Sequence, residues 1–288
     1  MPILLTFIII MTKNKRLIII FVALAVLTVL IIINSAVFSV RIVHPHALNY
    51  ELSAEDRNEV EKINELIREH HGIRTGSSIF MLNEERTVAA VRRNLLRREI
   101  AHAEIIRLER IFPNRVNIHY ILLRPYFYVE HRGQAKVFSD NGTLIFIESV
   151  SSARQRGAIG LRIDGELMSL ELGSEFNTSI QADVARFFTI IEAFQQLPHG
   201  EIGRDFEYVD ISNPSAIFLR MAFTEPMGTA VRMEIRAIAN FTEHFRHGLS
   251  AYRHFLQSTE HLYRTQSGTL LVTELATTGQ IVVTHSPD

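Results

Sequence analysis

The longest apolar run of the chain lies near its N-terminus. From Leu17 to Ile33 no residue is charged and Thr28 is the one polar side chain, and the run continues to Val40. A helix of ~20 such residues spans a bilayer. Three basic residues precede the run: Lys13, Lys15 and Arg16. The pattern predicts a cytoplasmic segment over 1–16, a transmembrane helix over 17–40 and an extracytoplasmic remainder.

A cleaved signal peptide is the alternative interpretation of this run. The apolar part of such a peptide extends to ~15 residues and ends at a small-residue cleavage site. This run is longer and has no clean site of that kind, so we expect an anchor. "MPILLTFIII" before Met11 is apolar but too short to span. Because translation from Met11 gives the usual order of charges, Met1–Ile10 is interpreted as an extension that is not translated.

Periodic apolar positions then predict two helices. Ser53 is a candidate N-cap, a stripe of apolar residues at helical spacing follows, and Gly72 ends the pattern. The stripe consists of Val60, Ile63 and Ile67. Asn83 is the expected cap of a second helix, which buries Val88, Val91 and Leu95.

A strand before the helices and a hairpin after them complete a small module. "VRIVHP" has the composition of a strand, and "AHAEIIRLERIF" and "RVNIHYILL" flank a turn at Pro113-Asn114. Val116, Ile118 and Tyr120 alternate on the face expected to pack against the helices. The region 41–125 is therefore predicted to be a β-α-α-β-β module.

The pattern becomes richer in strands after Tyr126. A hairpin is predicted to turn at Asp140-Asn141-Gly142, and apolar stripes predict helices over about 179–197 and 241–256. Further strands follow, and the last two lie at 268–275 and 280–284. The region 126–288 is thus predicted to be a mostly antiparallel sheet with two helices. The fold class is α+β behind a single membrane helix.

Composition excludes several classes of function. The 288 residues are 47% hydrophobic and carry a formal net charge of −1, which argues against a disordered or nucleic-acid-binding chain. The absence of cysteine removes disulfides, thiolate catalysis and Cys-based zinc sites.

Chemical motifs are equally scarce. No nucleophile elbow, zinc-protease helix or phosphate loop occurs, and we expect no enzymatic activity, cofactor or metal. Four histidines follow helical spacing: His244, His247, His254 and His261. His244 and His247 could share a metal ion, but the preferred interpretation is an exposed polar face opposite Phe241 and Phe245.

One basic cluster stands out in the second predicted helix. It consists of Arg92, Arg93, Arg97 and Arg98. Such a cluster can contact anionic lipid or another protein, or its aliphatic stems can cover the surface of the module.

The order of elements resembles the FtsQ/DivIB family of bacterial cell-division proteins, which carry a POTRA-type module and a C-terminal β domain. The resemblance covers the chain from the anchor onward and rests on "GSSIFMLNEE" and "RIFPNRVNIHYILLRP". The matching positions are Ile79, Phe80, Leu82, Arg110, Phe112, Pro113, Asn114, Ile118 and Pro125. The chain departs from the family pattern at Leu122-Leu123 and at "VRMEI".

The resemblance implies an extracytoplasmic scaffold of the septum that links early and late division proteins. Its partners are small bitopic coiled-coil proteins of the FtsB/DivIC and FtsL types, and one of them adds a β-strand to the edge of the C-terminal domain. The corresponding positions are Thr269, Leu270, Leu271, Val272, Thr273, Glu274 and Leu275, and the strand at Gln280 to Thr284 is a further candidate.

Three alternatives stay open at this point. The strand at 269–275 can pair internally on both sides, in which case it offers no edge. The chain can be an anchored enzyme, such as a cell-wall hydrolase whose paired carboxylates meet only in space. The module can also belong to another anchored transport or assembly protein.

Overall fold

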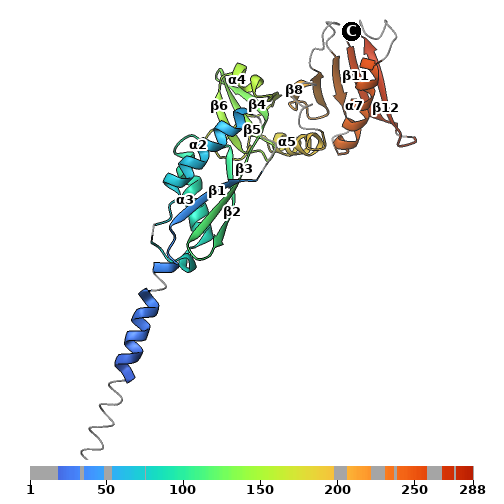
Figure 1. Cartoon of the computed structure of the whole chain (residues 1–288). Helices are drawn as coiled ribbons and strands as arrows, with labels where there is room; N and C mark the ends of the chain where they lie inside the picture. The colour runs from blue at the N-terminus through green and yellow to red at the C-terminus, as the bar shows by residue number, and fades with distance from the viewer. Residues whose placement is uncertain are drawn as a thin grey trace, which may run out of the picture. The chain divides into compact units, whose positions relative to one another are not determined.

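The computed structural model describes residues 19–32, 36–48, 54–74, 76–197, 206–221, 231–236, 239–257, 268–275 and 277–287. The chain divides into two compact units (Figure 1). Unit 1 comprises Met1–Arg98 and Ala103–Leu122, and unit 2 comprises Glu99–His102 and Leu123–Asp288.

Unit 1 contains the predicted succession of strand, two helices and two strands. Its elements are β1 (Ile42–Ala47), α2 (Ala54–His70), the short 3-10 helix η1 (Ile79–Met81), α3 (Glu84–Leu96), β2 (Ala103–Ile111) and β3 (Arg115–Leu122). β3 is the central strand, parallel to β1 and antiparallel to β2. The parallel pair requires a long crossover, which the two helices provide.

Local sequence signals explain the limits of these helices. The Asn83 side chain accepts the Arg86 N–H at 2.9 Å and so caps α3. Gly72 follows α2 with φ +70°, a conformation that glycine adopts without strain. The predicted cap at Ser53 lies outside the described residues.

The core of unit 1 is mostly aliphatic. The side chains between sheet and helices are at most 3% exposed: Ile63, Ile67, Val91, Leu95, Val116, Ile118 and Tyr120. The Tyr120 hydroxyl donates a hydrogen bond to Asn64 Oδ1 at 2.9 Å, and burial raises the pKa of Tyr120. The predicted inward face of β3 is therefore confirmed.

Unit 2 is built on one large sheet. Among the described residues, nine strands pair in the order β12-β11-β10-β9-β8-β7-β4-β5-β6. They are β4 (Pro125–His131), β5 (Gln134–Ser139), β6 (Leu144–Glu148), β7 (Ile159–Arg162), β8 (Phe206–Asp210), β9 (Ile217–Met221), β10 (Val231–Ile235), β11 (Gly268–Glu274) and β12 (Ile281–Pro287). The helices are α4 (Val150–Gln155), α5 (Gln181–Phe194) and α7 (Phe241–Gln257).

This arrangement confirms the α+β class, and five of the eight pairings described in the sheet are antiparallel, as predicted. It also has two features that the sequence does not predict. The sheet is mixed, because β4 and β7, β7 and β8, and β10 and β11 pair in parallel. A helix separates the two strands of each parallel pair along the chain, so the chain crosses over instead of turning back in a hairpin. The described part of unit 2 also has three helices where the sequence predicts two.

The N-terminal prediction is also corrected. Two parts of the apolar run are described: a helix over residues 19–32, whose side chains are all exposed, and residues 36–40, of which Ser39 and Val40 are buried. Nowhere in the described ranges is there a helix with both the length and the apolar character that crossing a bilayer requires. The transmembrane helix predicted over 17–40 is therefore not found. The segment 1–16 and the choice between Met1 and Met11 fall outside the described residues.

Candidate functional site at the outer edge of the C-terminal sheet

The strand predicted as a free edge is internal. β11, which contains Thr269 to Glu274, pairs in parallel with β10 and antiparallel with β12. The main-chain groups of an internal strand are bonded to its neighbours and cannot receive an added strand. The edge prediction for Thr269–Leu275 is therefore wrong. The error has a physical cause: the chain crosses over through α7, so β11 pairs in parallel with β10 instead of forming the edge.

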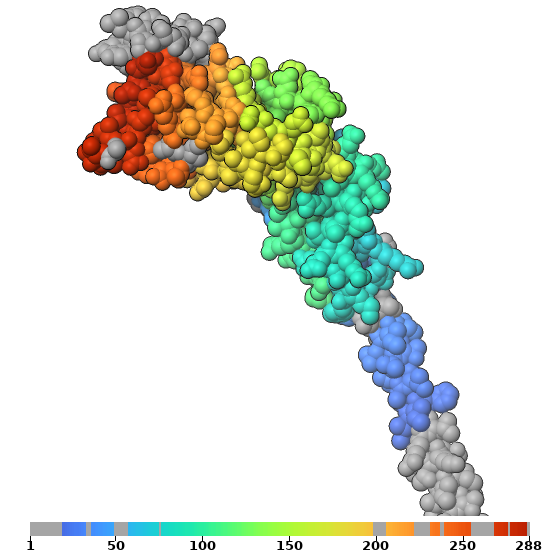
Figure 2. Space-filling model, turned by 180° about the vertical axis from the view of Figure 1, so that it is seen from behind, coloured from blue at the N-terminus to red at the C-terminus, as the bar shows by residue number. Residues whose placement is uncertain are grey.

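The edge belongs instead to β12. It stands at one end of the nine-stranded order, whose other end is β6, and it lies at the outer margin of unit 2 (Figure 1 and Figure 2). In the described part of the chain no strand pairs with its outer side. This strand contains part of the second sequence candidate, Gln280 to Thr284.

The turn between β11 and β12 determines which main-chain groups face outward. The Leu275 N–H donates to Gln280 O at 2.9 Å, and the register pairs Val272 with Val283. In an antiparallel ladder, hydrogen-bonded and non-bonded pairs alternate. The N–H and C=O groups of Ile281 and Val283 therefore point away from β11, toward the side where another strand can pair.

Side chains of the edge strand pack against the core of unit 2. Ile281 and Val283 pack against the core of unit 2, and Val272 beside them is completely buried. α7 approaches this part of the sheet closely, since a Cβ on Gly248 would lie 2.7 Å from Met233 Sδ and 2.9 Å from Val272 Cγ2. The edge thus rests on a rigid support.

The basic cluster lies at the C-terminal end of α3. Arg92, Arg93, Arg97 and Arg98 are all exposed around its last turn, where cations interact favourably with the helix dipole. Arg98 Nη2 lies 3.0 Å from His70 Nε2. The cluster belongs to unit 1, whereas the β12 edge belongs to unit 2.

The structure corrects the interpretation of the histidines on α7. His244 is 1% exposed, its Nδ1 lies 2.9 Å from Asn240 O, and its Nε2 lies 3.8 Å from a carboxylate oxygen of Glu274. It therefore belongs to the packed face of α7, whereas His247 and His254 are exposed. Within the described ranges no three His, Asp or Glu side chains are grouped so as to hold a metal ion. His261 lies outside those ranges.

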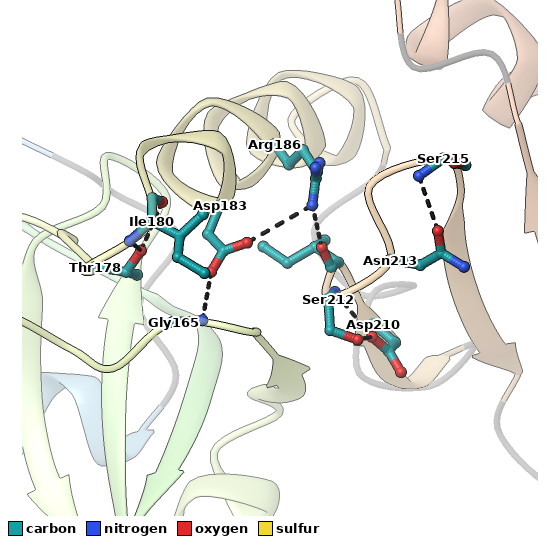
Figure 3. Close-up of polar contacts among 10 residues, drawn as sticks. Gly165, Thr178, Ile180, Asp183, Arg186, Asp210, Ser212, Asn213 and Ser215 are labelled. Atoms are coloured by element: carbon teal, nitrogen blue, oxygen red, sulfur yellow. Dashed lines mark hydrogen bonds and ion pairs between the residues drawn. The ribbon is translucent and has the colours of Figure 1, made fainter.

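The most conspicuous buried charge in unit 2 belongs to a network around α5 (Figure 3). Asp183 is completely buried; its Oδ2 accepts the Gly165 N–H at 2.8 Å, and its Oδ1 lies 3.7 Å from Arg186 Nη1. The same Arg186 nitrogen donates to Ile211 O at 2.6 Å. These bonds tie the loop before α5 to the end of β8. Their geometry is that of a structural link between loops.

A groove of about 350 Å³ between α5 and α7 provides a test of the hydrolase alternative. Retaining and inverting glycosidases require two carboxyl groups facing one another across the bond they cleave. No Asp or Glu belongs to the lining of this groove, which consists of Ala193, Gln196, Leu197, Thr242, Phe245, Arg246, Leu249, Ser250 and Arg253. The groove therefore offers nothing for that chemistry.

Comparison with known proteins adds no assignment. The chain matches no known family and no curated protein. The candidate site accordingly rests on the sheet itself and on the residues that support it.

Proposed function

We propose that this chain is a non-enzymatic interaction protein of the bacterial division septum, working on the outer side of the cytoplasmic membrane. It links early and late division proteins by binding the small bitopic coiled-coil partners implied by its resemblance to the FtsQ/DivIB family. The contact is strand addition to β12. The observation that carries the proposal is the outer side of β12, where Ile281 and Val283 direct main-chain groups away from the sheet.

Strand addition suits this edge for two physical reasons. Outward N–H and C=O groups supply hydrogen bonds to any extended peptide, and alternate side chains supply selectivity. Ile281 and Val283 lie on the face that packs against the core. A partner strand with apolar residues at alternate positions therefore continues this apolar face beyond β12, while its other side chains face solvent.

The proline substitution Val283→Pro tests the edge directly. Proline removes the outward N–H of residue 283 but no hydrogen bond to β11, so we expect the fold to persist and partner binding to fall. Val283→Ala is the matched control, because it shortens the side chain and keeps the N–H. Binding is measured by calorimetry with the purified extracytoplasmic segment of the small partner, and folding by thermal unfolding. Equal binding by the two variants contradicts strand addition.

The equivalent change in β11 distinguishes an internal strand from an edge. By the same alternation, the Leu271 N–H faces Thr284 in β12, so Leu271→Pro removes a ladder bond inside the sheet. We expect a loss of stability of roughly 1–3 kcal/mol or failure to fold, instead of a selective loss of binding. A folded Leu271→Pro protein that has lost only partner binding would restore the original edge assignment.

Cellular localisation tests the wider proposal. A fluorescent fusion of the full chain is expected to concentrate at midcell in dividing cells. Signal distributed evenly around the envelope, with no midcell band, contradicts a septal role even if β12 binds a peptide in vitro.

A further inference from the structure

One end of unit 1 exposes apolar side chains that the fold holds in a fixed arrangement. Three segments meet there: 36–41, 76–83 and 110–115, which together we call the aromatic tip (Figure 1). Phe80 is 52% exposed, Phe112 is 55% exposed and Met81 is 86% exposed. Unpartnered apolar surface of this kind on a folded domain marks a contact site.

The three phenylalanine rings of the aromatic tip contact one another. The ring centroids of Phe38 and Phe80 are 5.2 Å apart, those of Phe80 and Phe112 are also 5.2 Å apart, and those of Phe38 and Phe112 are 6.4 Å apart. The rings thus form one continuous patch contributed by all three segments.

Main-chain bonds hold these segments in place. The Ile79 N–H donates to Phe38 O at 2.8 Å, the Val40 N–H donates to Ser77 O at 2.9 Å, and the Arg41 N–H donates to Asn114 O at 2.9 Å. Ile79 is completely buried, so it anchors η1 while Phe80 and Met81 point outward. The patch is preformed by the fold.

The charge of the aromatic tip has one sign. Its three segments contain Arg41, Arg110 and Arg115, and Arg74 lies two residues before the second segment; none of these stretches contains Asp or Glu. Arg110 Nη2 donates to Leu82 O at 2.7 Å, and Arg41 Nη2 donates to Ala36 O at 2.7 Å, which keeps both guanidinium groups beside the apolar surface. The nearest acids along the chain have other partners: Glu84 accepts the Leu108 N–H, and Glu109 accepts from His119 and Asn117.

Aromatic and thioether side chains rimmed by arginines match the boundary between lipid headgroups and acyl chains. Exposed apolar side chains such as Phe insert at that boundary, and cations are attracted to anionic headgroups. The exposed apolar helix over 19–32 belongs to the same unit as the aromatic tip. We propose that the aromatic tip of unit 1 docks on a lipid surface with negatively charged headgroups. This inference does not depend on the β12 edge.

The absence of tryptophan from the chain allows a sharp test. Phe80→Trp in the full chain places one reporter in the aromatic tip, and Phe188→Trp places one at a 41% exposed site on α5 of unit 2. Vesicles of zwitterionic lipid alone, or with added phosphatidylglycerol, are then mixed with each protein. We expect a shift of emission to shorter wavelength, and quenching by brominated lipid, for Phe80→Trp with anionic vesicles. Phe188→Trp should show neither effect.

This pair of reporters distinguishes docking of the aromatic tip from attachment of the chain by its apolar N-terminal run. Both variants carry the same apolar N-terminal run, so both sediment equally with vesicles if that run alone attaches the chain. Equal sedimentation with no spectral change at Phe80→Trp overturns the proposal, as does an equal change at both sites. A concentration-dependent shift without vesicles also overturns it, because it identifies a second copy as the occupant.

Charge reversal tests the choice of anionic lipid. In the Phe80→Trp protein, Arg74→Glu is expected to weaken anionic-vesicle docking roughly tenfold, because each basic residue near a charged membrane contributes measurably to binding. Arg93→Glu is the matched control, since Arg93 lies about 15 Å from the N-terminus of α3 along the helix axis. Equal effects of the two reversals, or none from Arg74→Glu, contradict lipid docking by the tip.

Discussion

Phenylalanine has opposite placements in the two units. In unit 2 eight of the described phenylalanines are at most 2% exposed: Phe127, Phe138, Phe176, Phe187, Phe194, Phe206, Phe241 and Phe245. In unit 1 no described phenylalanine is buried, and the core relies on aliphatic side chains and Tyr120. Unit 2 thus uses its aromatic rings for stability, whereas the rings of unit 1 are available for contact.

The difference follows from the volume that each unit must fill. A large twisted sheet covered by α5 and α7 leaves wide spaces, and stacked rings fill them, as where the centroids of Phe176 and Phe187 lie 3.8 Å apart. A three-stranded sheet under two helices is filled by Ile, Val and Leu. Rings that unit 1 does not need in its core can therefore serve at the surface without weakening the fold.

The largest loss of stability is expected from Phe187→Ala in unit 2. Phe187 is completely buried, and truncating such a ring leaves a cavity that costs about 3–5 kcal/mol. Hydrogen exchange monitored by mass spectrometry should show faster exchange throughout unit 2 and little change in unit 1.

The matching change in unit 1 is Phe80→Ala. We expect a loss of stability below about 1 kcal/mol, because this ring is half exposed and loses only ring contacts. A loss comparable with that of Phe187→Ala would show that the tip rings are part of the core, and the contrast between the units would then fail.

An intermediate loss of stability is expected from Asp183→Ala, which tests whether the stability of unit 2 depends on its aromatic rings alone. The change removes the acceptor of the Gly165 N–H and the charge near Arg186, at a cost of about 1–3 kcal/mol. Denaturant unfolding measures the loss. Asp183→Asn keeps an acceptor oxygen and should lose less; equal losses would assign the effect to the charge.

The smallest expected effect on stability comes from the titration of a histidine in unit 1. His71 Nδ1 accepts the Ile73 N–H at 3.0 Å, and burial, followed by the nearby His70, lowers the pKa of His71 below its ordinary value of 6.5. The unfolded chain therefore takes up this proton at a higher pH than the folded chain does. The contribution to stability is present above pH 6.5 and is lost as the pH falls toward the folded pKa.

Comparing the pH dependence of unfolding for the original chain and His71→Gln isolates this contribution. The two curves should converge on the acid side. Parallel curves through this range would contradict the lowered pKa.

Local patterns were sufficient to predict much of the fold. The cap at Asn83, the stop at Gly72 and the alternation in β3 each depend on residues close together in sequence, and each appears as predicted. Phe188 shows the limit of this reasoning. It stands next to Phe187 in the apolar sequence that predicts α5, yet it is 41% exposed, whereas Phe187 is completely buried.

The candidate site could not be located by pattern alone. β11 and β12 have similar apolar sequences, and which of them is the edge depends on where α7 directs the chain. The burial of His244 has the same origin: a helical projection predicts which side chains share a face but not how much of the helix circumference the sheet covers. Both errors come from tertiary packing.

The strand order of unit 2 has a consequence for synthesis. From β8 to β12 each new strand pairs beside the one made before it, so during translation the growing end of the sheet always has an open edge. α7 must be complete before β11 can pair with β10. Each strand from β8 to β11 is thus an exposed edge until the next strand pairs with it, and β12 remains an edge in the folded protein. A partner that binds β12 prevents this edge from pairing wrongly with another chain, a risk that each earlier edge carried for a short time.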